Sequence, residues 1–237
     1  VYKIVDSKGN IEAEISAGGL APAAGVLSGA ESVETSDGAN ITLSVAQADS
    51  FSVSMTSILS GYDIDDSASA IENAFTPGTN QEMLLTSADA INVSTGTAVL
   101  SVSNYAQLLN DGSAAGTPAM PGPQFMHDEM PDMSGGSVSI DPSQFAIQDS
   151  ASAINDTMEL SDADFQAVSQ VTATTFGDDL TSMDNLVNRV DAIELSGPSN
   201  TLNVDQAALV SDASTGSFEV EDSASAIEAE VTDTSAG

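Results

Sequence analysis

The sequence predicts a mainly β protein with short helices, arranged as an elongated, solenoid-like stack of repeats. Three observations support this prediction: a ten-residue motif that occurs three times almost unchanged, a second motif that lies between its copies, and a lack of bulky core residues. Tandem β-sandwich units are the alternative, because short alternating strands separated by turns are also typical of sandwiches.

The first motif has the pattern aromatic-x-[Ile/Val]-x-Asp-Ser-Ala-Ser-Ala-Ile and occupies residues 62–71, 145–154 and 218–227. Its aromatic and aliphatic residues alternate with polar ones, which predicts a short, half-buried strand. The Asp-Ser pair offers oxygens to free backbone N–H groups, so a helix of one or two turns should follow. The predicted helix caps are Asp66, Ser67, Asp149, Ser150, Asp222 and Ser223. The predicted repeat core consists of Tyr62, Ile64, Ile71, Phe145, Ile147, Ile154, Phe218, Val220 and Ile227.

The second motif combines a strand, a polar turn, another strand and a short helix. It runs from Ala90 to Ser94 and from Leu100 to Leu109, and similar segments begin at Ala192 and Leu202. An earlier relative covers residues 41–48. Strands and short helices in a fixed order favour an architecture in which each repeat contacts mainly its neighbours.

Four regions are predicted along the chain. Residues 1–40 should form a β-hairpin around Ser-Lys-Gly-Asn and then a linker rich in Gly, Ala and Ser. Residues 41–110 form repeat unit one, residues 111–142 a Pro- and Met-rich insertion, and residues 143–237 repeat units two and three. Apolar spacing predicts an amphipathic helix from Leu180 to Val190. Because the chain starts at Val1 without Met, we interpret it as a fragment or a processed form.

Charge is the most unusual property of the composition. The chain has 36 acidic and 3 basic residues and a formal net charge of −33. Repulsion of this size destabilises a compact state unless cations screen it, and divalent cations should screen it best. So few basic residues argue against binding to nucleic acid or to anionic membranes, since both need Lys and Arg. No run of 18 apolar residues occurs, so no membrane insertion is predicted.

Calcium is the one cofactor that the acidic clusters suggest, because it prefers carboxylate and carbonyl oxygens. The candidate ligands are Asp63, Asp65, Asp66, Glu219, Glu221 and Asp222. In the second copy of the first motif only Asp149 is acidic, with Ala146 and Gln148 beside it. The constant aspartate alone therefore fits a helix cap better than a metal site.

Catalysis is not expected. The chain has no Cys and only one histidine, His127, and it lacks a Gly-x-Ser-x-Gly segment. These absences argue against disulfides, thiolate metal sites and the usual nucleophilic triads. Paired carboxylates occur throughout, so they do not point to a hydrolase.

The copies of the first motif, together with the Leu-Ser-Val and Gln-Ala segments between them, resemble repeats of very large secreted proteins from aquatic bacteria, including cyanobacteria. The resemblance covers about residues 40–110 and 140–230. It implies an extracellular or cell-surface protein, such as an adhesin, a surface-layer component or a matrix fibre, often in calcium-containing surroundings. The uneven spacing and the insertions depart from a regular array, which leaves open a more specialised assembly role.

We therefore expect a structural surface or fibre protein that associates with itself into a homo-oligomer or filament. Repeat stacking and pairing of edge strands would drive this assembly, with divalent cations screening the acidic surface. A glycan-binding adhesin or a phage-fibre or virion-appendage module is the alternative, and its partner would be a glycan or cell-surface ligand.

Overall fold

The computed structural model describes residues 2–17, 27, 30–50, 61–79, 81–110, 138–175, 186–195, 201–210, 219–221 and 223. The chain forms two compact units. Unit one comprises Val1–Ala98 and Ala106–Asp141, and unit two comprises Val99–Tyr105 and Pro142–Gly237.

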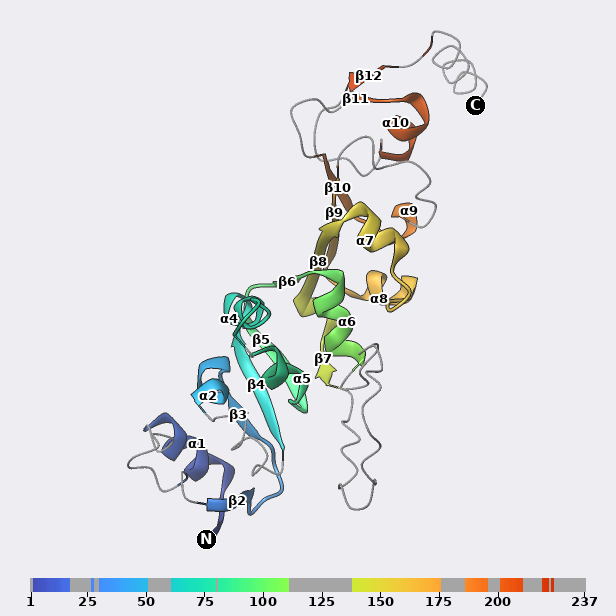
Figure 1. The fold of residues 1–237 in the computed structure, drawn as a ribbon. Helices are drawn as coiled ribbons and strands as arrows, with labels where there is room; N and C mark the ends of the chain where they lie inside the picture. The colour runs from blue at the N-terminus through green and yellow to red at the C-terminus, as the bar shows by residue number, and fades with distance from the viewer. Residues whose placement is uncertain are drawn as a thin grey trace, which may run out of the picture. The chain divides into compact units, whose positions relative to one another are not determined.

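The described residues form parallel sheets joined by short helices, so the chain is mixed α/β rather than mainly β (Figure 1). The physical reason is the direction of strand pairing. Antiparallel neighbours need only a tight turn between them, whereas parallel neighbours need a crossover, which is usually helical. The segments between the strands supply these crossover helices.

Unit one contains two parallel sheets. In the smaller sheet, β1 (Tyr2–Asp6) pairs with β2 (Ala30–Thr35). The larger sheet has the order β3 (Ile41–Leu43), β4 (Tyr62–Ser67), β5 (Ala90–Thr95) and β7 (Ser139–Ile140). The crossovers contain α2 (Val45–Ser50), α4 (Ala68–Ala74) and α5 (Glu82–Thr86). Neighbouring strands therefore follow one another across the larger sheet in chain order.

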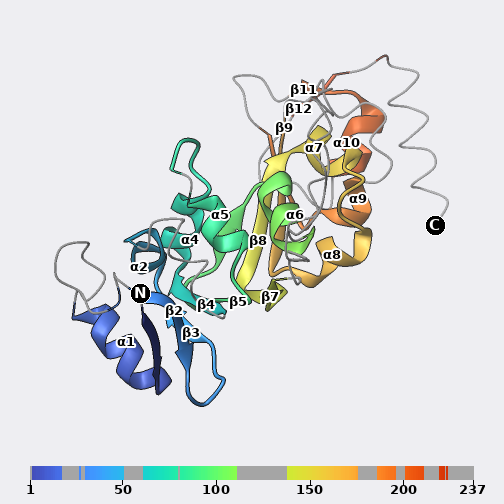
Figure 2. The same ribbon diagram turned by 60° about the horizontal axis from the view of Figure 1, so that its bottom comes forward.

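One face of the larger sheet is buried by helices. In β4, Tyr62 and Ile64 are buried while Asp63 and Asp65 are not, as the alternation of a strand requires. The helices α2, α4 and α5 contact one another, and Figure 2 shows them along one side of the strands. The side chain of Tyr62 lies on the face that these helices cover, because its hydroxyl donates a hydrogen bond of 2.6 Å to the Leu84 carbonyl of α5.

The predicted β-hairpin at the N-terminus was wrong. The segment from Lys8 to Ser16 is the helix α1, and β1 pairs in parallel with β2 instead. Ser7 caps α1 by accepting a hydrogen bond from the Asn10 N–H. Ile11 and Ile15 are buried on the same helix face. Their spacing of four residues fits either a strand face or a helix face, and the serine cap and packing of the helix decide the outcome.

Unit two repeats this architecture. Its sheet has the order β6 (Ala98–Leu100), β8 (Phe145–Ser150), β9 (Gln170–Thr175) and β10 (Ala192–Leu195). The helices are α6 (Val102–Asn110), which continues into unit one, and α7 (Ala151–Asp156), α8 (Asp162–Ala167) and α9 (Leu186–Arg189). A 3-10 turn, η2 (Pro142–Gln144), precedes β8. The helix α9 lies in the stretch predicted to be helical, and the first part of that stretch lies outside the described residues.

The last described elements form a separate small pairing. The two-residue strands β11 (Thr201–Leu202) and β12 (Glu219–Val220) are parallel, and α10 (Val204–Val210) follows β11. Val220 is 45% exposed, so its predicted place in the repeat core was wrong. Among the described strands β12 pairs only with β11, so it has a neighbour on one side alone. No helix in the described ranges combines the length and apolar character that a membrane crossing requires.

Candidate functional site

The repeated aspartate of the first motif joins two consecutive strand–helix segments. Asp66 accepts hydrogen bonds from the Ser67 N–H at Oδ1 (2.7 Å) and from the Val45 N–H at Oδ2 (3.0 Å). Asp149 repeats both contacts, with the Ser150 N–H at 2.7 Å and the Val102 N–H at 3.0 Å. We call β4–α4 and β8–α7 the aspartate segments, and β3–α2 and β6–α6 the leading segments. The carboxylate thus links each aspartate segment to the leading segment before it.

Parallel pairing explains this geometry. Because β3 and β4 run in the same direction, the end of β4 lies beside the point where α2 begins. The first N–H groups of a helix have no acceptor within the helix, and they form the positive end of its dipole. The Asp66 carboxylate satisfies one of these groups with a charge-assisted hydrogen bond. Such bonds contribute about 1.5–3 kcal/mol each, with the lower end expected here because both aspartates are only half-buried.

The adjacent serine, not the aspartate, caps the helix of its own segment. Ser67 Oγ accepts from the Ala70 N–H at 3.3 Å, and Ser150 Oγ accepts from the Ala153 N–H at 3.2 Å. The sequence predicted that Asp and Ser would share the role of cap, whereas the structure divides the work between them. Of the third copy, Asp222 lies outside the described residues and Ser223 is exposed.

The helices α2 and α10 share a reciprocal cap that was not predicted from the sequence, and at the start of α6 the Ser101 Oγ accepts from the Asn104 N–H at 3.2 Å. Ser44 Oγ accepts from the Gln47 N–H at 3.1 Å, and Gln47 Oε1 accepts from the Ser44 N–H at 2.8 Å. Asn203 and Gln206 make the same reciprocal pair at the start of α10. The signal in the sequence is [Ser/Asn]-Val-x-Gln, a form of the capping box. In α2, the Val45 N–H lies between these two capped groups and donates to Asp66.

The core residues of two copies lie where the sequence predicted them. Tyr62, Ile64 and Ile71 are at most 3% exposed, and Phe145, Ile147 and Ile154 are fully buried. Phe218 and Ile227 lie outside the described residues. The ring of Phe145 lies 6.0 Å from that of Tyr105 on the leading segment, so the two segments also share an aromatic contact.

Two buried tyrosines have side-chain pKa values above the ordinary one. Burial raises the pKa of Tyr62 to about 12, with the Asp89 carboxylate adding to the effect. Burial likewise raises the pKa of Tyr105 to about 12, with a further contribution from Asp164. Both phenols are therefore kept neutral and act as core residues with one polar end.

A fourth copy of the first motif lies at the N-terminus and was missed. Residues 2–11 keep the aromatic residue, the isoleucines and the Asp-Ser pair at the same spacing, with Lys-Gly-Asn in place of Ala-Ser-Ala. Asp6 Oδ1 accepts from the Ser7 N–H at 2.7 Å, as in the other copies, and also from Asn10 Nδ2 at 2.8 Å. The Asn10 amide, followed by the Ser7 N–H, holds the pKa of Asp6 below its ordinary value. The turn-like composition of Lys-Gly-Asn concealed this copy.

The predicted calcium ligands do not gather in the described residues. Asp63 accepts from Asn40 Nδ2 at 2.9 Å, Asp65 accepts from Asn92 Nδ2 at 3.1 Å, and Asp66 accepts backbone N–H groups. Glu221 is exposed, and Asp222 lies outside the described ranges. No three His, Cys, Asp or Glu side chains of the described residues come close enough together to hold one metal ion.

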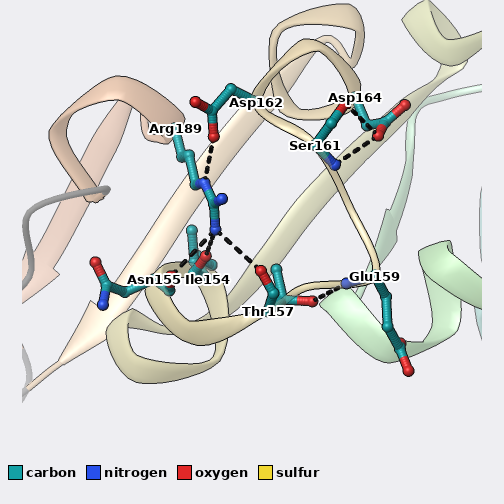
Figure 3. A network of polar contacts seen from close by, with 8 residues as sticks. All are labelled: Ile154, Asn155, Thr157, Glu159, Ser161, Asp162, Asp164 and Arg189. Carbon is teal, nitrogen blue, oxygen red and sulfur yellow. Dashed lines mark hydrogen bonds and ion pairs between the residues drawn. The ribbon is translucent and has the colours of Figure 1, made fainter.

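Arg189 organises the helices of unit two (Figure 3). Its Nε donates to Asp162 at 2.7 Å, and its Nη1 donates to the carbonyls of Ile154 at 2.7 Å and Asn155 at 3.1 Å, with a longer contact of 3.4 Å to the Thr157 carbonyl. The guanidinium also lies 5.2 Å from the centre of the Phe165 ring. One cation thus satisfies carbonyls at the end of α7 and ties α7 and α8 to α9. Nothing in the local sequence around Arg189 indicates this role, because its partners lie 27 to 35 positions away.

Comparisons with models of known protein families, with curated proteins and with solved structures find no match to this chain. We therefore infer function from the geometry of the repeats.

Proposed function

We propose that this chain is a non-catalytic structural protein of an extracellular surface or fibre, and that it associates with itself by continuing the stacking of its own repeats. In this proposal each unit is a short, solenoid-like stack. The observation that supports it most strongly is the bridging carboxylate, because Asp66 and Asp149 make the same two hydrogen bonds at equivalent positions in two different units.

A bridging carboxylate means that a single segment is incomplete. The first N–H group of the leading helix α2 has no acceptor within the helix, and it donates to Asp66 of the next segment. The buried ring of Tyr62 similarly contacts α5, which belongs to the following crossover. Segments that complete one another gain stability with each repeat added, which is the property of repeat proteins that form long assemblies.

The hydrogen bonding of the buried polar side chains also favours a structural role. In the described part of the chain, every buried side-chain nitrogen and oxygen has a hydrogen-bond partner. The bridging aspartates are bound to backbone N–H groups. Catalytic groups, in contrast, are usually aimed at the site that a substrate will occupy.

The charge of the chain suggests how assembly is controlled. A net charge of −33 on each copy opposes association unless cations are bound or concentrated at the surface. Divalent cations reduce this repulsion more effectively per ion than sodium. We therefore include calcium as a screening ion and assign it no specific ligands.

The test is sedimentation velocity over a range of protein concentrations, with negative-stain imaging of the same samples. Solutions of calcium chloride, magnesium chloride and sodium chloride are matched in ionic strength, and a further sample contains a chelator. We expect species larger than the monomer in calcium, growing with protein concentration, and smaller species in the chelator. A monomer in every solution would contradict the proposed function, and strong binding on a glycan array would favour the adhesin alternative.

A further inference from the structure

Equivalent residues of the first motif differ sharply in exposure between its copies. Tyr2 is 46% exposed, whereas Tyr62 is 3% exposed and Phe145 is fully buried. Ile4 is half-buried, whereas its counterparts Ile64 and Ile147 are buried completely. The motif and its strand–helix structure are the same in all three places, so the difference must come from what lies beside them.

The buried copies each have a leading segment on one side. The strand β4 lies between β3 and β5, and β8 lies between β6 and β9. Among the described strands, β1 pairs only with β2, which occupies the position that β5 has beside β4. The side of β1 that corresponds to β3 or β6 therefore has no strand beside it among the described residues, and we call it the uncovered side.

Asp6 differs from the other aspartates in the same way. In Asp66 and Asp149, Oδ2 binds the first N–H group of the leading helix. Both described hydrogen bonds to the Asp6 carboxylate are made at Oδ1, and the side chain is exposed. Asp6 thus has the local contacts of a bridging aspartate, and none of its described hydrogen bonds uses Oδ2.

A hollow of about 400 Å³ lies at this end of unit one. Its lining consists of Ile4, Asp6, Asn10, Ile11, Ala13, Glu14 and Leu27. In the copy at residues 62–71, the equivalents of Ile4, Asp6, Asn10 and Ile11 belong to β4 and α4, and both of those elements contact the leading helix α2. The hollow therefore lies where a leading helix would pack.

We propose that this end of unit one, formed by β1 and α1, docks the segment Thr201–Val210 (β11–α10) of a second copy of the chain. The proposal deepens the proposed function and depends on it, because it names the surfaces through which copies associate. The segment β11–α10 shares two features with the leading segment β3–α2: a buried leucine, Leu202, equivalent to Leu43, and a reciprocal cap, Asn203–Gln206, equivalent to Ser44–Gln47.

The copy of the first motif that follows β11–α10 has an exposed core residue in its described part. Among the described residues of this pairing, Val220 of β12 is 45% exposed, whereas its equivalents Ile64 and Ile147 are buried. Both β12 and β1 belong to copies of the first motif, so β1 of a second chain can take the place of β12. By this equivalence Ile4 pairs with Leu202, and Asp6 faces the N-terminus of α10.

An interface of this kind is directional. The surface at β1–α1 differs from the surface at β11–α10, so a docked pair still has one free surface of each kind, one on each copy. Such contacts generate open chains of subunits unless the geometry happens to close a ring. The interface would repeat one already present inside the molecule, with the exposed Tyr2 becoming buried as Tyr62 and Phe145 are.

The first test uses substitutions at the exposed end of the full-length chain. Tyr2→Ser and Asp6→Ala should each weaken self-association at least about tenfold in sedimentation velocity, since burial of an aromatic ring and a charge-assisted hydrogen bond are each worth 1.4 kcal/mol or more. Met158→Ser, at a 98% exposed residue, and Asp37→Ala, at an exposed turn, are the matched controls and should change it less than twofold. Circular dichroism establishes that each variant is folded.

The second test uses the absence of cysteine from the chain. The pairing of β11 with β12 places Thr201 opposite Glu219, and Lys3 is the equivalent of Glu219 in β1. A mixture of the Lys3→Cys and Thr201→Cys proteins should therefore form a 3–201 disulfide on mild oxidation, identified by mass spectrometry. Lys3→Cys mixed with Met158→Cys is the control.

The outcomes separate the two proposals. A wild-type chain that never associates contradicts the proposed function itself. Association that survives Tyr2→Ser and Asp6→Ala, or cross-links between two copies of position 3 in place of the 3–201 pair, leaves the proposed function standing and overturns this docking surface.

Discussion

The bridging aspartates use the two oxygens of one carboxylate for different purposes. Oδ1 holds the Asp-Ser corner in place, and Oδ2 reaches a helix of the preceding segment. Glutamate would place its oxygens too far along the side chain for the Oδ1 contact to the next residue, and asparagine would offer one acceptor oxygen in place of two. The residue type thus follows from the geometry of the corner.

Replacement of Asp149 tests the energy of this bridge. We expect Asp149→Ala to lower the free energy of unfolding by about 3 kcal/mol, because two charge-assisted hydrogen bonds to backbone N–H groups are lost, each at the lower end of the usual range. Asp149→Asn should lose roughly half as much. Glu159→Ala is the control, since it removes the same charge from an exposed position and should change stability by less than about 0.5 kcal/mol. Equal effects of Asp149→Ala and Glu159→Ala in urea unfolding would disprove the bridge.

Gly96 lies at the end of β5 in a conformation that favours glycine. Its φ is +83°, and a Cβ added there would lie 3.2 Å from the Cβ of Ala68. We expect Gly96→Ala to lower the melting temperature, at a cost of about 1–2 kcal/mol. Gly9→Ala is the opposite control, because Gly9 lies within α1 with no atom within 4 Å of the added Cβ. That substitution should stabilise the chain by about 0.5–1 kcal/mol, and a stabilising Gly96→Ala would contradict the argument.

At the scale of elements, each short helix depends on contacts outside itself. Helices of six or seven residues, such as α2, α4 and α7, are too short to be stable alone in water. Their caps, their bridging carboxylates and the sheet face beneath them supply the missing stability. The loss of one such contact should therefore loosen a helix together with its neighbours.

Arg189 is the strongest example of this dependence. Its side chain is 10% exposed, and it connects Asp162 with the carbonyls at the end of α7. We expect Arg189→Lys to cost about 2–3 kcal/mol in denaturant unfolding, because a single ammonium cannot reproduce the fork of donors. Lys3→Met, which removes an exposed pair with Glu34, should cost less than about 0.5 kcal/mol. If Arg189→Lys behaves like Lys3→Met, then the helices of unit two are held by other contacts.

The hydroxyl of Tyr62 links β4 to α5, and it makes the free energy of unfolding depend on pH in the alkaline range. The pKa is about 12 in the fold and about 10 in an unfolded chain. The neutral phenol therefore stabilises the fold fully below pH 10, and this contribution is lost as the pH rises from 10 through 12. We expect the free energy of unfolding to fall over this range, and to fall less steeply in Tyr62→Phe. The same slope in Tyr62→Phe as in the wild type would refute the assignment.

At the scale of the whole molecule, the charge balance controls the energetics. The three basic residues each form an ion pair, between Lys3 and Glu34, Lys8 and Glu12, and Arg189 and Asp162. With 36 acidic residues in the chain, these pairs leave most carboxylates to be balanced by ions from solution. The folded chain therefore concentrates negative charge that the unfolded chain spreads over a larger volume.

Added salt should consequently stabilise the fold. The Debye length falls from about 10 Å at 0.1 M to about 3 Å at 1 M, so repulsion between surface carboxylates weakens over this range. We expect the melting temperature to rise by several degrees in sodium chloride, and to rise further in calcium chloride at the same ionic strength. A melting temperature that falls as sodium chloride rises to 0.5 M would contradict the conclusion that repulsion between carboxylates is the dominant electrostatic effect.

The sequence alone determined the features that depend on neighbouring residues. The alternation around Ile64, the caps at Ser67 and Ser150 and the buried aromatics are all recognisable within ten residues, because strand period and cap chemistry are local properties. The N-terminal copy was equally present in the sequence, although its turn-like Lys-Gly-Asn favoured the wrong interpretation.

Only the tertiary structure decided which distant groups meet. Asp66 binds a residue 21 positions away and Asp149 one 47 positions away, and Arg189 reaches carbonyls 32 to 35 positions away. The parallel direction of the strands sets these distances, since it brings the end of each strand beside the start of the preceding helix. The sequence motif shows that a carboxylate is present, but the partner that this carboxylate binds depends on the order of the strands in the sheet.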